Sequence, residues 1–111
     1  MLPKQNRLTY QEFIKNKTIA SKFHSQNFSL TFKKSKELYP RFIILVPKSL
    51  DKRSVFRHLT RRIMVEAIRI YLKNIKQPAD CLLKPNKILK RRDLSTVNEE
   101  IRKLFLLAGL L

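Results

Sequence analysis

The chain has 111 residues, with 25 Lys and Arg against 8 Asp and Glu, so its formal net charge is +17. This length suits one domain, 1–111, and an apolar content of 43% excludes a disordered basic tail. A small domain needs a net charge of only about 2–8 in magnitude to stay soluble. Residues 51–92 carry thirteen basic and three acidic side chains, whereas residues 93–111 carry two and three. A charge placed in this way is typical of a surface that binds nucleic acid phosphates.

The composition also indicates the cellular compartment in which the protein is expected. A single cysteine, Cys81, excludes an internal disulfide and indicates a reducing environment. The start of the chain has no signal-peptide pattern. The longest apolar runs are far shorter than the ~20 residues that a membrane span needs. We therefore expect a cytoplasmic protein with no membrane association.

Protein-based catalysis and metal binding find little support in the sequence. The acidic residues are scattered, whereas a metal nuclease needs clustered carboxylates. Cys81, His24 and His58 lack the spacing of a zinc site. The only glycine, Gly109, excludes a glycine-rich phosphate loop. We expect no catalytic residue and no metal ligand in the protein itself.

The first half of the chain predicts a short helix and three strands. Thr9 and Glu12 have the spacing of a capping box, which starts a helix that carries Phe13. Residues 18–26 allow a short edge strand. Residues 28–33 alternate apolar with polar, which predicts a strand with one buried and one wet face. The continuous apolar run 42–46 predicts a central strand covered on both sides.

The second half predicts a helix, a strand and a final helix. The long helix runs from about Ser54 to Lys73, and a short strand follows at 80–84. Residues 85–92 form a basic loop. The last helix carries one apolar stripe, made of Val97, Ile101, Leu104, Phe105 and Ala108. The order α-β-β-β-α-β-α predicts a single-domain α+β sandwich of one sheet with helices.

The long helix is the most informative segment. At 100° per residue, Val55, Leu59, Ile63 and Ile70 fall on one apolar stripe. The segment from Lys52 to Arg69 carries six basic residues and only one acid, Glu66. Such a surface repels itself unless a polyanion neutralises it. Nucleic acid is therefore the expected partner.

Several segments together resemble the protein subunit of bacterial ribonuclease P, nearly end to end. They are Leu2-Pro-Lys-x-Asn-Arg-Leu8 with Phe13, Arg41-Phe-Ile-Ile-Leu-Val-Pro-Lys48, Arg57-His-Leu-Thr-Arg-Arg62 with Glu66 and Arg69, and Leu107-Ala-Gly-Leu-Leu111. The chain departs from that family in five places. His58 stands for an Asn and Leu59 for an Arg of the Arg-rich helix motif, Ile43 for a strand glycine, and Pro47 with Ser49 alters a Ser-Lys-Lys segment.

The resemblance implies a four-stranded mixed sheet packed with helices, with a left-handed β-α-β crossover. It also implies that an RNA subunit with bound Mg²⁺ removes the 5′ leader from precursor tRNA, while the protein holds no cofactor alone. The expected partners are the catalytic RNA and the leader, and the free protein is expected to be monomeric. The alternative is a structural RNA-binding protein of ribosomal type with no role in processing.

Two groups of residues are the candidate contacts. Clustered guanidinium groups suit phosphate, so the candidate RNA-binding residues are Lys48, Lys52, Arg53, Arg57, His58, Arg61, Arg62 and Arg69. The candidate leader-binding cleft, by resemblance, comprises Phe13, Lys17, Thr31 and Lys33. For Phe13, core packing remains an alternative to base stacking. A looser basic cluster is expected to act by long-range attraction, and its members are Lys84, Lys87, Lys90, Arg91 and Arg92.

Overall fold

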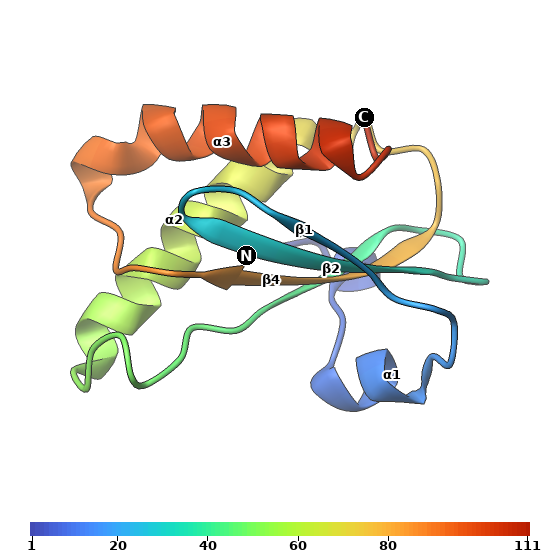
Figure 1. Cartoon of the computed structure of the whole chain (residues 1–111), viewed down its shortest axis with the longest axis horizontal. Helices are drawn as coiled ribbons and strands as arrows, with labels where there is room; N and C mark the ends of the chain where they lie inside the picture. The colour runs from blue at the N-terminus through green and yellow to red at the C-terminus, as the bar shows by residue number, and fades with distance from the viewer.

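The computed structural model describes all residues 1–111, and its elements follow the predicted order (Figure 1). The four strands are β1 (Ser21–His24), β2 (Phe28–Lys34), β3 (Arg41–Ile44) and β4 (Ala79–Pro85). The three helices are α1 (Tyr10–Lys15), α2 (Ser54–Leu72) and α3 (Leu94–Leu107), with short 3₁₀ turns at Lys4–Asn6 and Arg91–Asp93. The capping box at Thr9 is present, as the sequence predicts. No helix is long and apolar enough to cross a membrane.

The strands form one mixed sheet in the order β1-β2-β4-β3. β2 pairs antiparallel with β1 and with β4, whereas β3 pairs parallel with β4, and α2 makes the crossover between them. The prediction that 42–46 forms a central strand is therefore wrong, because β3 lies at the edge of the sheet. Its outer side carries one bridge, between Arg7 and Phe42. The run is apolar throughout because Ile43, on the side of the sheet away from the main core, is also half-buried.

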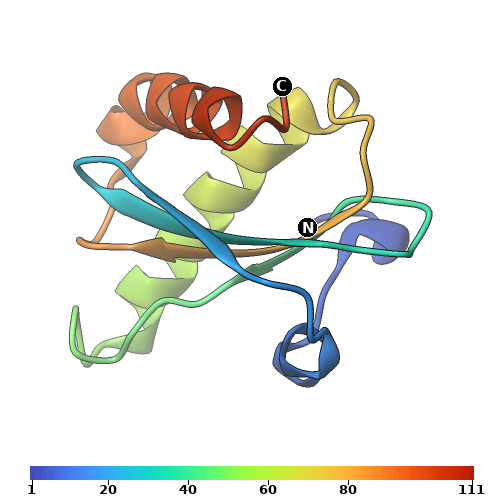
Figure 2. The same cartoon turned by 45° about the vertical axis from the view of Figure 1, so that its right-hand side comes forward.

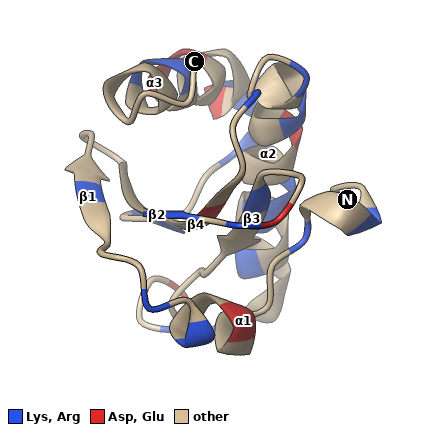
Figure 3. Ribbon diagram, turned by 90° about the vertical axis from the view of Figure 1, so that its right-hand side faces the viewer, with Lys and Arg blue, Asp and Glu red and all other residues tan.

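Helices α2 and α3 cover one face of the sheet, and α1 lies against the other face (Figures 2 and 3). The main core lies under α2 and α3 and includes Phe28 and Leu30 of β2. The rings of Phe42 and Phe105 stack there with their centroids 5.6 Å apart. The predicted alternation of β2 is confirmed, since Ser29, Thr31 and Lys33 point away from this core and are half-buried.

The buried face of α2 differs from the predicted stripe. Its buried residues are Thr60, Ile63, Met64, Ala67 and Ile68. Val55 is 65% exposed and Ile70 is 53% exposed, so only Ile63 of the predicted stripe is fully buried. Leu59 is half-buried and packs against the edge of the core. The stripe of α3 is confirmed at its four buried positions, and Ala108 packs at its end.

Candidate nucleic-acid interface

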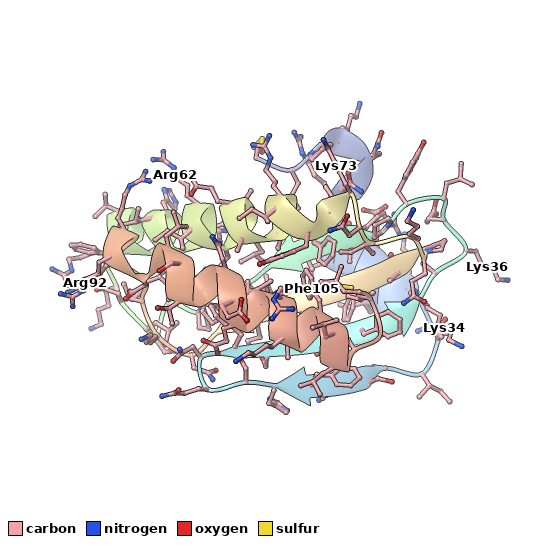
Figure 4. All side chains as sticks on the ribbon, turned by 90° about the horizontal axis from the view of Figure 1, so that it is seen from above. Lys34, Lys36, Arg62, Lys73, Arg92 and Phe105 are labelled. Atoms are coloured by element: carbon pink, nitrogen blue, oxygen red, sulfur yellow. The ribbon has the colours of Figure 1, made fainter.

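The outward face of α2 carries a row of exposed basic side chains. His58, Arg61, Arg62 and Arg69 border one surface hollow of about 460 Å³, together with Met1, Val65 and Glu66. Figure 4 labels Arg62 on α2 and Lys73 directly after its last residue, and both side chains are exposed. None of these basic residues forms an ion pair within the protein. The row is therefore a strip of positive charge in which one carboxylate, that of Glu66, lies among three guanidinium groups and pairs with none of them.

The segment before α2 places three more candidates beside this helix. Lys48, Lys52 and Arg53 are all exposed. Arg53 donates through Nε to Asp51 Oδ1 at 3.0 Å and through Nη2 to Asp51 Oδ2 at 2.9 Å. Its guanidinium lies 4.3 Å from the centroid of the Phe56 ring. Arg53 is thus held in one orientation while its side chain stays 70% exposed.

Arg57 differs from its neighbours because it is half-buried. Its Nε is buried and has no hydrogen-bond partner within the protein. Three residues further along α2, Thr60 Oγ1 donates to Phe56 O at 3.0 Å and accepts from Leu89 N at 2.9 Å. This bond fixes the basic loop after β4 against the first half of α2. The loop after β4 therefore packs against the first half of α2 through Leu89, on the buried side of the helix.

The candidate leader-binding residues lie on the face of the sheet that carries α1. Phe13 is 7% exposed, and Lys33 Nζ lies 4.1 Å from the centroid of its ring. Lys33 Nζ also donates to Phe13 O at 2.9 Å and to Asn16 O at 3.0 Å. The structure therefore brings Phe13 and Lys33 into contact, and it favours packing for the ring. Lys17 is exposed just beyond α1, and Thr31 is half-buried on β2.

A buried ionic network fixes α1 on the sheet, and the sequence interpretation missed it. Asp80 is 1% exposed and accepts from Arg41 Nε at 3.0 Å, Arg41 Nη2 at 3.2 Å and Asn16 Nδ2 at 2.9 Å. Arg41 Nη1 donates to Glu12 Oε2 at 2.8 Å. The carboxyl pKa of Glu12 is lowered, first by the hydrogen bond from the Thr9 backbone and further by Arg41. The available signal was the acidic Asp80 directly before the apolar residues Cys81, Leu82 and Leu83 of the predicted strand.

Potential metal ligands do not cluster in the structure, since no group of three or more His, Cys, Asp or Glu side chains comes together in a way that could hold a metal ion. Cys81 is buried, and this burial raises the pKa of its thiol well above the usual range, with a smaller effect from Asp80.

The fold and the charged surface together define a small α+β protein with an arginine-rich helix on its surface, an arrangement typical of nucleic-acid-binding proteins. The family model Ribonuclease P matches residues 2–109. Because this match spans nearly the whole sequence, the chain belongs to the bacterial ribonuclease P protein family and has the role of its protein subunit. No curated protein sequence matches the chain.

Solved structures show the same fold at low sequence identity. A mutant ribonuclease P protein of Staphylococcus aureus with defective mRNA degradation activity is 16% identical, with a TM-score of 0.79, over 97% of this chain and 92% of that one. A second structure of the S. aureus protein is 16% identical, with a TM-score of 0.74, over 95% and 96%. The Thermotoga maritima ribonuclease P protein is 20% identical, with a TM-score of 0.71, over 88% and 93%.

Proposed function

We propose that the outward face of α2 binds the catalytic RNA subunit of ribonuclease P. The observation that carries this proposal is the row of His58, Arg61, Arg62 and Arg69, which lies on one side of a single helix with no ion pair. Guanidinium groups bind phosphate through two parallel hydrogen bonds, so a row of them suits an RNA backbone. The candidates Lys48, Lys52, Arg53 and Arg57 extend this surface at the start of the helix.

The chemistry of the holoenzyme belongs to the RNA subunit and its Mg²⁺ in this proposal. That RNA hydrolyses the phosphodiester that joins the 5′ leader to the tRNA body. The protein supplies positive charge and shape, and it lowers the repulsion between two polyanions that must come together. Membership of a bacterial family supports a place in the cytoplasm.

The leader is the second proposed ligand. In the proposed cleft, on the face of the sheet that carries α1, the contacts would be the exposed Lys17 and the half-buried Thr31. Phe13 and Lys33 form its wall, since each covers the other and Lys33 also binds the carbonyl groups at the end of α1.

The alternative of a ribosomal-type structural protein finds no support in the family match or in the fold. Reconstitution separates the two functions. We expect the protein to stimulate cleavage of precursor tRNA by the cognate RNA subunit at low Mg²⁺, and to cleave nothing by itself. The proposal would be wrong if the protein matured precursor tRNA without RNA, or if it left the activity of the RNA subunit unchanged.

A further inference from the structure

A second basic hollow lies beyond the end of α1. It has a volume of about 680 Å³ and lies between the end of α1 and the turn that joins β2 to β3. Lys15 and Lys17 border it from the α1 side, and Lys34 and Lys36 border it from the β2 side. Figure 4 shows Lys34 and Lys36 at the end of the molecule opposite Arg92. The hollow is therefore separate from the start of α2 and its neighbouring basic loop.

The charge balance of this hollow leaves its lysines without partners. Three carboxylates border it, but those of Glu12 and Asp80 are both paired with Arg41. No lysine of the chain forms an ion pair. Only the exposed Glu37 remains to offset the four ammonium groups. The hollow thus holds a local excess of positive charge that a chain of phosphates would neutralise.

The two walls of the hollow are fixed relative to one another. Asn16 Nδ2 donates to Lys34 O at 3.0 Å and to Asp80 Oδ2 at 2.9 Å, so the end of α1 is bonded directly to β2 and β4. Lys33 holds the same end of α1 through its two carbonyl contacts. A binding surface that is fixed before the ligand arrives loses less conformational entropy on binding.

From this arrangement we infer that the lysine hollow binds phosphates of the 5′ leader upstream of the proposed cleft. The inference rests on the proposed function, because Lys17 borders the lysine hollow and also belongs to the proposed leader cleft. A leader bound in the cleft would extend past Lys17 into the hollow. The contacts are to phosphates, so the hollow recognises a single strand without reading its bases. Precursors with leaders long enough to reach it would bind more tightly than those with short leaders.

The test compares precursor tRNAs that share one tRNA body and differ in leader length. Their affinities for the reconstituted holoenzyme are measured at several salt concentrations. The variant is Lys34→Ala with Lys36→Ala, which removes two exposed lysines of the hollow. The matched control is Lys76→Ala with Lys103→Ala, which removes two exposed lysines elsewhere. A second variant, Lys15→Ala with Lys36→Ala, removes one lysine from each wall.

We expect both hollow variants to lose affinity only for long leaders. The slope of log K against log salt should become shallower by about 1.4, because each phosphate contact on a single strand contributes roughly 0.7. The control should retain the wild-type slope. Equal losses for leaderless tRNA would assign the lysines to the tRNA body or the RNA subunit and overturn the inference, as would no loss at all. Failure of the proposed function would show differently, as a wild-type holoenzyme without any leader dependence.

Discussion

Arg41 and Asp80 form the most buried ion pair of the molecule, with side chains that are 15% and 1% exposed. The guanidinium donates two hydrogen bonds to one carboxylate, which is the bidentate geometry that makes such pairs strong. Its third contact, to Glu12, reaches the first turn of α1. One arginine at the edge of the sheet therefore helps to hold the helix that borders the proposed leader cleft.

Arg41→Ala should destabilise the fold. It leaves the Asp80 carboxylate buried with only Asn16 as a partner, and removing one member of a buried pair costs about 3–5 kcal/mol. Because Arg41 is partly exposed, we expect a loss of about 3 kcal/mol in the free energy of unfolding, measured with urea. Arg102→Ala, which breaks an exposed pair with Glu99, is the control and should change little. Equal effects of the two variants would contradict this account.

The stability of α1 should fall in acid through Glu12. Its pKa is lowered in the folded protein, by the Thr9 backbone first and by Arg41 to a lesser degree. The stabilisation is therefore fully present above the pKa of an unfolded glutamate, about 4.3, and is lost as pH falls through the lowered value. Melting curves between pH 6 and pH 3 should show a smaller acid-induced drop for Glu12→Gln than for the wild type. A drop of the same size in both proteins would exclude Glu12 as a contributor.

Cys81 should be inert in the folded protein. Burial raises the pKa of its thiol far above neutral pH, and the thiolate is the reactive form. A thiol reagent at pH 8 should label the unfolded chain rapidly and the native chain only as fast as the protein opens. Rapid labelling of the native protein would mean that β4 is more accessible than its burial indicates.

Leu59→Arg and Arg61→Ala should have opposite effects. Leu59 packs against the edge of the core, so the arginine should lower the free energy of unfolding by about 1.5 kcal/mol, the lower limit for a fully buried leucine. Arg61 is exposed and unpaired, so its loss should leave the melting temperature nearly unchanged and weaken RNA binding. Leu59→Arg with wild-type stability and tighter RNA binding would place position 59 in the interface.

Local patterns in the sequence were sufficient for the order of elements, because capping and alternation act over a few residues. Residue spacing predicted the wrong buried face for α2, because tertiary contacts decide which of its residues are buried. Thr60 is polar yet buried, because its hydroxyl bonds to Phe56 and Leu89. Val55 is apolar yet exposed, so the two positions together rotated the predicted stripe of α2 away from the buried face.

The edge position of β3 and the ionic network around Asp80 could not be predicted from the sequence, for another reason. Both depend on which strands become neighbours, and Arg41 lies 39 residues from Asp80 along the chain. The residues of the arginine row could be predicted because they are clustered on one helix. The lysine hollow joins two elements and needed the structure.

The most direct test of the central claim is the salt dependence of binding between the protein and the cognate RNA subunit. If the α2 surface neutralises about five phosphates, the slope of log K against log salt should be near −4 to −5, using roughly 0.9 per contact for a duplex. Arg61→Ala with Arg62→Ala should make that slope shallower by about 1.8. A slope near zero for the wild type, or an unchanged slope for the variant, would show that the arginine row is not the interface.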